Sequence, residues 1–453
     1  MALTVVFDRG TLRLAGADEL LPFTKRDPAS GELRAPAYRF GDLAAWLDAC
    51  GRGLEGDLRR AWDARPRPID DLGLRPYQEE ALASWEAFGR RGVVALPTGA
   101  GKTRVAIAAM RATGLPALVL CPTRALLAAW AEELAKRFDE PIGVVGDGKR
   151  RLERVTVMTF ESGFRHLSEV GDRFGLLVVD EVHHFAGGIR SEALEACAAP
   201  ARLGLSATAP RAGSEGAERL SALIGPVVYE VGVRALVGRH LAELSVLQLP
   251  VCLAEDERAA YERLVEPLKQ MRRAWFRANR RATYAAFVRA MSADEAGRRA
   301  MRAYARGLDI AYFPREKRAT VRALLARHRG DRTIVFTARA EDAYRVATDS
   351  LVPVITAEVS AAERARILAR FRAGSIRAIA TARVLNEGID VPDARVAIVV
   401  AGTLGEREHV QRIGRVLRPA PGKRALCYEL VTLETVDARL AAARGAHAAA
   451  APA

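Results

Sequence analysis

A glycine-rich segment between an apolar run and a helix-like run carries the residue types that hold a nucleoside triphosphate. Residues 97–103 have the sequence Pro-Thr-Gly-Ala-Gly-Lys-Thr and directly follow the apolar residues 93–96. Glycines let backbone N–H groups face phosphates, and the N-terminus of a following helix adds the positive end of its dipole. We expect Lys102 to reach the β- and γ-phosphates and Thr103 to hold Mg²⁺. Because a strict phosphate loop has glycine where this sequence has Leu96, the segment alone also fits an ordinary glycine-rich turn.

A pair of acids at the end of a second apolar run favours the nucleotide interpretation. Asp180 and Glu181 follow the apolar residues 176–179. An aspartate there can bind Mg²⁺, usually through water, and a glutamate can orient and deprotonate the attacking water. Together the two segments predict hydrolysis of ATP with Mg²⁺. The predicted nucleotide contacts in the loop are Pro97, Thr98, Gly99, Ala100, Gly101, Lys102 and Thr103.

Two arginines near the end of the sequence could complete such a site. Arg415 and Arg418 lie three residues apart in the segment 410–419, so on a helix they share one face. Aimed at the γ-phosphate, they would act as arginine fingers and stabilise the charge that develops there. A basic surface helix explains the same spacing nearly as well.

Composition limits the classes of protein that the chain can belong to. Half of the 453 residues are hydrophobic, which predicts a folded chain with two or three domains. No apolar stretch approaches the roughly 20 residues of a membrane-spanning helix, and the first ten residues do not have the pattern of a secretory signal. The five cysteines lack Cys-x-x-Cys spacing, which argues against a zinc site and a disulfide framework. The net charge of +14 favours a polyanionic partner, with nucleic acid first and an anionic membrane surface second.

The elements that must position these residues follow a βαβ rhythm, in which apolar strand candidates alternate with helical segments. The candidates lie at 92–98, 117–123, 154–160, 175–181 and 202–208, and again at 332–338, 352–358, 376–382, 396–402 and 425–431. This rhythm predicts an α/β fold with two doubly wound parallel sheets. We expect a small module with short strands and a helix at 1–66, a nucleotide-binding domain at 67–240, a second α/β domain at 241–440 and a disordered tail at 441–453.

A basic and aromatic segment lies between the two α/β domains, within a predicted helical insert at 262–310. Residues 267–306 contain Lys269 and ten arginines against Asp294 and Glu295, a net charge of +9. Cations can neutralise phosphates while aromatic faces stack on exposed bases. The alternative is a helical hairpin whose aromatic side chains form its core and whose arginines are solvated. We favour DNA contact because the charge is clustered, and we assign it to Arg272, Arg273, Trp275, Arg277, Arg280 and Arg281.

Nine short motifs in order make the chain resemble a superfamily 2 helicase. They lie at 74–78, 97–103, 122–126, 159–160, 180–183, 206–208, 334–338, 382–390 and 411–418. The Asp-Glu-Val-His sequence of the fifth motif, the N-terminal module and the total length resemble the XPB-type DNA repair helicases, in particular their compact prokaryotic members.

This resemblance implies two RecA-like motor domains with a small N-terminal α+β module, similar to a damage-recognition domain, and a thumb-like helical insert. The implied activity is that of an ATP-dependent 3′–5′ DNA helicase in nucleotide excision repair or related DNA processing. It further implies a monomer that is cytoplasmic and nucleoid-associated, binds forked or damaged DNA and works beside a structure-specific nuclease. The resemblance implies that Gln78, with Arg75 nearby, recognises adenine, and that Gly388, Asp390 and Gln411 contact the nucleotide and the other domain. It implies that His183, Ser206 and Thr208 couple ATP hydrolysis to motion between the domains. The implied contacts with the DNA backbone are Thr123, Arg124 and Thr381.

One segment departs from the family pattern. XPB-type proteins that resemble this chain carry Arg-Glu-Asp shortly after the motif at 206–208, and this chain has Arg211-Ala212-Gly213. Since that element is associated with strand separation, a double-strand DNA translocase without processive unwinding is an alternative to a helicase. An ATP-gated DNA clamp is a third interpretation.

Overall fold

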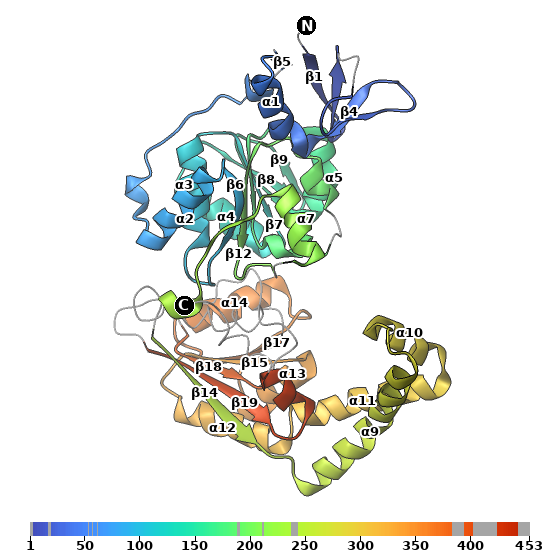
Figure 1. The fold of residues 1–453 in the computed structure, drawn as a ribbon. Coiled ribbons are helices and arrows are strands. Elements are labelled where there is room, and N and C mark those ends of the chain that lie inside the picture. The colour runs from blue at the N-terminus through green and yellow to red at the C-terminus, as the bar shows by residue number, and fades with distance from the viewer. Residues whose placement is uncertain are drawn as a thin grey trace. The chain divides into compact units, whose positions relative to one another are not determined.

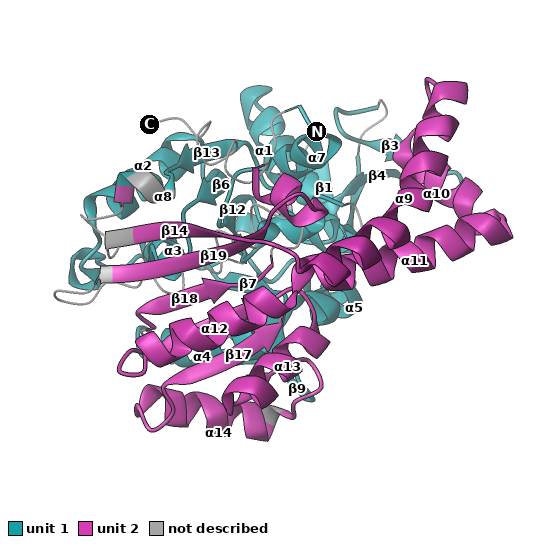
Figure 2. Cartoon of the chain, turned by 90° about the horizontal axis from the view of Figure 1, so that it is seen from below, with its two compact units in different colours: residues 1–235, 387–389 teal, residues 236–386, 390–453 magenta. Residues whose placement is uncertain are grey.

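The computed structural model describes residues 3–16, 20–52, 54–56, 58–60, 62–187, 191–210, 213–236, 243–382, 394–401 and 424–442. The chain divides into two compact units, of which the first spans Met1–Ala235 and the second begins at Leu236 (Figure 2). The N-terminal module therefore belongs to the same unit as the first motor domain. The second unit begins close to the predicted boundary between residues 240 and 241.

The N-terminal module is a small sheet covered by one helix. Its five strands lie in the order β3-β4-β2-β1-β5, and β1 and β2 form a hairpin, whose turn places Arg9 and Gly10 at positive φ. The indole N–H of Trp62 donates to the carbonyl of Asp172 at 2.7 Å, which links the module to the segment 171–175 of the same unit. The elements are β1 (Leu3–Asp8), β2 (Thr11–Ala15), β3 (Lys25–Arg26), β4 (Leu33–Pro36), η1 (Ala37–Arg39), α1 (Phe40–Ala49), β5 (Leu54–Glu55) and η2 (Leu58–Arg60).

The first motor domain is built on an eight-stranded sheet in the order β13-β6-β12-β11-β7-β10-β8-β9. All neighbouring pairs are parallel except β8 and β9, which form an antiparallel edge. The central strands are buried along their whole length, which is why they read as continuous apolar runs in the sequence. The strands are β6 (Arg91–Ala95), β7 (Ala117–Cys121), β8 (Ile142–Gly146), β9 (Lys149–Arg151), β10 (Val155–Thr159), β11 (Leu176–Val179), β12 (Ala201–Ser206) and β13 (Val227–Glu230).

Three helices of this domain, α3 (Lys102–Thr113), α4 (Arg124–Ala135) and α5 (Phe160–Val170), begin after the carboxyl ends of β6, β7 and β10 (Figure 1). The side chains of Thr123 and Thr159 accept hydrogen bonds from Leu126 N and Ser162 N, both at 3.2 Å, and so cap α4 and α5. This places each helix start at the same edge of the sheet. The helical elements are η3 (Asp70–Leu72), α2 (Pro76–Ala87), α3 (Lys102–Thr113), α4 (Arg124–Ala135), α5 (Phe160–Val170), η4 (Val182–Phe185), α6 (Glu192–Glu195), α7 (Glu215–Leu223) and α8 (Val233–Leu236).

The second unit contains a parallel sheet of six strands in the order β14-β19-β18-β15-β17-β16. Both sheets confirm the predicted α/β fold. The edge strand β14, which pairs with β19 from Glu243 opposite Arg424 to Val251 opposite Thr432, was not predicted. The elements are β14 (Glu243–Val251), α12 (Arg315–Arg327), β15 (Thr333–Thr337), α13 (Ala340–Ser350), β16 (Val354–Ile355), α14 (Ala361–Arg372), β17 (Ala378–Ala382), β18 (Val396–Val399) and β19 (Arg424–Thr432).

The predicted insert is a helical arm that extends from the second unit (Figures 1 and 2). It consists of α9 (Glu255–Ala278), α10 (Tyr284–Ala293) and α11 (Glu295–Tyr312). Gly307 of α11 lets the two long helices approach closely, because a Cβ there would lie 2.5 Å from a methyl carbon of Val265. Near the tip, a small apolar cluster around Leu268, Phe287 and Ala300 holds the three helices together.

Candidate active site

The phosphate loop follows β6 and ends at the first turn of α3. Gly99 and Gly101 have φ values of +87° and +80°, which only glycine adopts readily. The Nζ of Lys102 donates to the carbonyl of Leu96 at 3.1 Å. The Oγ1 of Thr98 is buried and has no hydrogen-bond partner among the described residues. A buried donor without a partner, a lysine bonded only to its own loop and glycines at positive φ fit a loop shaped for phosphate oxygens.

Two side chains of α2 support this loop from behind. The hydroxyl of Tyr77 and the Nε2 of Gln78 both donate to the carbonyl of Ala100, at 2.8 and 2.7 Å. The Oε1 of Gln78 accepts from the backbone N–H of Arg75 at 2.9 Å. The amide predicted to recognise adenine is therefore buried here and already bonded at both ends, so in this structure it holds the loop and the start of α2. Sequence reasoning missed Tyr77, which carries no local sign of this contact.

The two predicted catalytic acids lie directly after β11. Asp180 is only 7% exposed; its Oδ2 accepts from the indole N–H of Trp130 at 2.9 Å and its Oδ1 from the backbone N–H of Glu181 at 3.0 Å. Burial raises the pKa of the Asp180 carboxyl, while the Trp130 hydrogen bond and the charge of Lys102 oppose that rise. A carboxylate with so little access to water is suited to a bound cation. Sequence reasoning also missed Trp130.

The backbone of Glu181 is strained in a way that often marks a functional position. Its φ and ψ are +50° and +48°, the left-handed region that non-glycine residues seldom occupy. The Nδ1 of His183 lies 3.4 Å from its Oε2. His183, predicted to couple the two motor domains, thus contacts the predicted catalytic base.

The predicted coupling residues after β12 are joined to the phosphate loop through the backbone. The hydroxyl of Ser206 donates to the carbonyl of Thr208 at 2.7 Å, and the carbonyl of Ser206 accepts from the N–H of Leu96 at 3.0 Å. Leu96, directly before the phosphate loop, and Ser206 are therefore linked by a backbone hydrogen bond. Their coupling role stays a prediction.

The predicted DNA-backbone residues differ in their accessibility. Arg124 is exposed at the start of α4 and forms an ion pair with Asp147 at 3.1 Å, and Thr123 caps that helix. Thr381 differs from the prediction, because it is 1% exposed and its hydroxyl donates to the carbonyl of Ile355 at 2.9 Å. In this structure it strengthens the β16–β17 edge and presents no group to a phosphate.

The arm separates its charges from most of its aromatic side chains. Trp275, predicted to contact DNA, lies in the apolar cluster of the arm, with ring centroids 5.1 Å from Phe276 and 5.6 Å from Phe287. The ring of Trp275 is half-buried and packs the hairpin, and its DNA contact stays a prediction. Tyr284 is the aromatic residue of the arm that is largely exposed, at 61%. The five predicted arginines are all exposed: Arg272, Arg273, Arg277, Arg280 and Arg281.

Several predicted residues lie outside the described part of the chain, and their roles stay predictions: Gly388, Asp390, Gln411, Arg415, Arg418 and the pair Arg211-Ala212. Among the described residues, no helix is long and apolar enough to cross a membrane.

Known domain families match three parts of the chain. Residues 5–54 match the Xeroderma pigmentosum group B helicase damage recognition domain, residues 71–211 match the res subunit of type III restriction enzymes, and residues 316–420 match the helicase conserved C-terminal domain. The first match covers most of the N-terminal module. The other two fall on the two predicted motor domains.

Similar proteins and structures agree with these matches. A protein of Sulfurisphaera tokodaii named DNA 3′-5′ translocase XPB2 is 36% identical over 386 residues, which cover 84% of this chain and 87% of that protein. A Mycobacterium tuberculosis protein named DNA 3′-5′ helicase XPB is 30% identical over 420 residues, covering 89% and 66%. The crystal structure of the Pyrococcus furiosus Hef helicase domain shares the fold, with a TM-score of 0.52 and 18% identity over 83% of this chain and 98% of that one. The chain therefore belongs to the XPB-type family of superfamily 2 helicases.

Proposed function

We propose that this protein is a DNA-dependent ATPase that moves 3′ to 5′ on DNA and opens duplex DNA during repair. One observation carries the proposal. The strands β6, β12, β11 and β7 are neighbours in one parallel sheet, and the segments after them are the phosphate loop, residues 206–208, the acids at 180–181 and the DNA-contacting segment 122–126. Carboxyl ends of parallel strands share one edge, where α/β proteins bind their ligands.

Each residue at this edge has a separate proposed role in ATP hydrolysis. When bound, ATP supplies the phosphoryl group and Mg²⁺ neutralises charge on the phosphates. The loop amides and Lys102 would bind the phosphates, and Thr103 with Asp180 would hold the metal. Glu181 would orient the attacking water and accept its proton, and His183, 3.4 Å from that carboxylate, would fix its direction. Catalytic roles for Arg415 and Arg418 belong to the same proposal.

DNA is proposed to contact three surfaces through its backbone. The exposed start of α4 at Arg124 offers one cation to a phosphate, and the exposed arginines of the arm offer several more. Residues 5–54 match a damage-recognition domain, which supports a further contact at distorted DNA. Contacts with the DNA backbone provide affinity that does not depend on base sequence, as a protein that moves along DNA requires.

The test measures ATP hydrolysis and strand separation together on a 3′-tailed forked DNA. Glu181→Gln removes the proposed base, and Glu169→Gln is the matched control, because Glu169 is an exposed acid of the same unit paired with Arg150 at the surface. We expect DNA to stimulate hydrolysis in the wild type and the control, with the fork opened, and Glu181→Gln to abolish both. Hydrolysis that is indifferent to DNA would refute the proposal.

A double-strand translocase is the second candidate. The chain lacks the two acids of the Arg-Glu-Asp element at 211–213, and the S. tokodaii relative is named a translocase. Displacement of a triplex-forming strand from intact duplex, without opening of the fork, would favour this alternative.

We further propose that the protein acts as a nucleoid-associated monomer and that a separate structure-specific nuclease makes any incision. Sedimentation of the protein with and without forked DNA tests the first part. Incision of the fork by the purified protein alone would contradict the second.

A further inference from the structure

Helix α4 connects the proposed DNA contact with the proposed metal ligand. It begins directly after Thr123, at the exposed Arg124. Trp130 lies seven residues after Thr123, two turns further along the same helix face. There its indole N–H donates to the Oδ2 of Asp180 at 2.9 Å. One rigid element thus has a cation for DNA at one end and a donor to the metal-binding carboxylate in its middle.

The contact is closed to water and determines the orientation of the carboxylate. Trp130 is 3% exposed and Asp180 7%. The second oxygen of Asp180 is held by the N–H of Glu181 at 3.0 Å, so one donor on each oxygen fixes the rotation of the group. Loss of a hydrogen bond to a buried charged group is among the larger single perturbations in a protein.

The other buried indoles of the first unit provide a comparison. Trp62 donates to the carbonyl of Asp172 at 2.7 Å and Trp85 to the carbonyl of Arg202 at 2.9 Å. Both acceptors are backbone groups that take no part in the proposed chemistry. Trp130 differs in that its acceptor is the carboxylate proposed to hold Mg²⁺.

We propose that Trp130 is a positioning residue that makes metal binding at Asp180 depend on DNA at the start of α4. A phosphate held at Thr123 and Arg124 fixes α4, and the indole then fixes the carboxylate in its metal-binding orientation. The inference rests on the proposed function and adds the route by which DNA stimulates hydrolysis.

The experiment compares Trp130→Phe with Trp62→Phe, since each keeps an aromatic ring and removes one indole donor. The readouts are Mn²⁺ affinity with a non-hydrolysable ATP analogue, measured by electron paramagnetic resonance with and without DNA, and DNA affinity by fluorescence anisotropy. In the wild type and in Trp62→Phe we expect DNA to tighten Mn²⁺ binding. In Trp130→Phe, Mn²⁺ should bind about tenfold more weakly and DNA should no longer tighten it, while DNA affinity measured without Mn²⁺ and nucleotide is unchanged.

A second variant tests the other end of the route and does not depend on the stability of Trp130→Phe. Arg124→Ala removes an exposed side chain and should reduce the effect of saturating DNA on Mn²⁺ affinity. Combined with Trp130→Phe it should cause no further loss. Equal behaviour of Trp130→Phe and Trp62→Phe, or additive losses, would overturn the inference. If the wild type hydrolyses ATP without regard to DNA, the proposed function fails instead.

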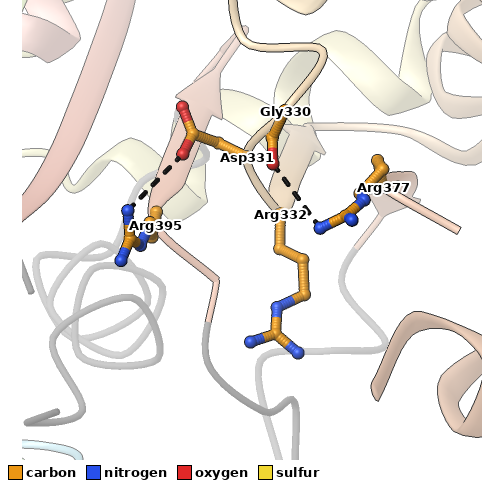
Figure 3. Close-up of a pocket in the computed structure, with 5 residues that line it drawn as sticks. All are labelled: Gly330, Asp331, Arg332, Arg377 and Arg395. Carbon is orange, nitrogen blue, oxygen red and sulfur yellow. Dashed lines mark hydrogen bonds and ion pairs between the residues drawn. The ribbon is translucent and has the colours of Figure 1, made fainter. Parts of the chain in front are cut away.

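An independent observation lies at the opposite end of the sheet of the second unit. Arg332, Arg377 and Arg395 immediately precede β15, β17 and β18, which are neighbouring strands. Their side chains surround a cavity of about 210 Å³ that Gly330 and Asp331 also line (Figure 3). This amino-terminal edge is distinct from the carboxyl edge, where the motif at 334–338 ends.

Three guanidinium groups line this cavity, and among the described residues Asp331 is the one carboxylate that lines it. The Oδ1 of Asp331 lies 3.9 Å from Arg395, and its Oδ2 lies 3.2 Å from the Nδ1 of His328. Arg377 donates to the carbonyl of Gly330 at 3.5 Å, and Arg332 donates to the carbonyl of Arg372 at 3.0 Å. Guanidinium groups offer paired donors that match the oxygens of phosphate. We infer that this cavity binds a phosphate group, either free or in a DNA backbone.

The test compares the triple variant Arg332→Ala, Arg377→Ala, Arg395→Ala with Arg366→Ala, an exposed arginine of α14 outside the cavity. With ADP and Mg²⁺ saturating the phosphate loop, inorganic phosphate should raise the melting temperature of the wild type and of Arg366→Ala more than chloride of equal ionic strength does. The triple variant should lose this difference if free phosphate binds. Lower duplex affinity with a shallower salt dependence in the triple variant indicates a DNA phosphate. Equal behaviour of the two variants in both assays would overturn the inference.

Discussion

A buried ion pair in the second unit gives a stability prediction with a defined size. Lys317 and Asp437 are 0% and 1% exposed, and their charged atoms lie 2.7 Å apart. The Nζ of Lys317 also donates to the carbonyls of Val400 and Tyr312, and the same oxygen of Asp437 accepts from the N–H of Thr432 at 3.0 Å. The pair therefore links the end of α11 to the residue that follows β18 and to the last residue of β19. We predict that Lys317→Met destabilises the second unit by about 3–5 kcal/mol, because the Asp437 charge stays buried without its partner.

Adding Asp437→Asn to Lys317→Met should restore part of this stability. The amide oxygen still accepts from Thr432 N–H, and the unpaired charge is gone, so the loss should fall to about 1–3 kcal/mol. Hydrogen exchange measured by mass spectrometry follows each unit separately. For amides of β15 and β18 that exchange only by unfolding, the single variant should exchange about 10²- to 10⁴-fold faster. Amides of β7 and β11 in the first unit are the internal control.

The sign of the coupling free energy between the two substitutions shows whether the buried charge of Asp437 causes the loss of stability. If the double variant is at least as unstable as Lys317→Met alone, the buried charge is not the source of the loss. The explanation would then be packing of the lysine side chain, and the reasoning would be refuted.

Three further predictions follow from single contacts. Gly101→Ala should weaken binding of a fluorescent ATP analogue by about tenfold or more, because φ is +80° and the new Cβ would lie 2.4 Å from the Nε2 of Gln78; unchanged affinity would contradict this. Tyr284→Ala should weaken single-stranded DNA binding by about 1–3 kcal/mol in an anisotropy titration while Tyr284→Phe does not, since the exposed ring can stack on a base. The hydrogen bond from Arg318 lowers the pKa of Asp349 below its ordinary value of 3.8, so the pair stabilises the fold above that pH and is lost as pH falls through the lowered pKa. Thermal melts should show Asp349→Asn less stable by about 0.5–1 kcal/mol at pH 7, with the difference shrinking below about pH 3.8; a constant difference would count against the pairing.

Most of the fold is predictable from sequence because buried parallel strands are continuous apolar runs. Strands such as β7 and β11 coincide with such runs, and each ends where a polar loop begins. The edge strand β14 is less apparent, because Pro250 interrupts its pattern. A proline removes a backbone donor and is tolerated there because β14 lies at the edge of the sheet. The strands β3 and β5 of the N-terminal module, with two residues each, are too short to show any period.

The nucleotide site is predictable to the extent that its geometry is local. A loop of glycines before a helix needs no distant partner to face phosphates, so residues 97–103 can be read directly. The contacts of Tyr77 and Trp130 join elements far apart in the sequence and depend on how helices pack on the sheet. The same holds for Thr381, whose residue type suits DNA contact but whose position is buried, and for Trp275, whose ring is half-buried against the apolar cluster of the arm.

The order of strands in the first sheet places the proposed DNA contact and the proposed metal ligand after neighbouring strands. β7, which leads to the segment proposed to contact DNA, lies directly beside β11, which leads to the acids. At their ends the N–H of Asp180 donates to the carbonyl of Leu120 at 2.9 Å, and past the strands the indole of Trp130 continues the connection to the Asp180 side chain. The segment after β7 is therefore linked to the proposed metal ligand Asp180 by one backbone contact and one side-chain contact. Since the backbone contact survives Trp130→Phe, loss of the effect of DNA on Mn²⁺ affinity in that variant assigns the coupling to the indole and not to the paired strands.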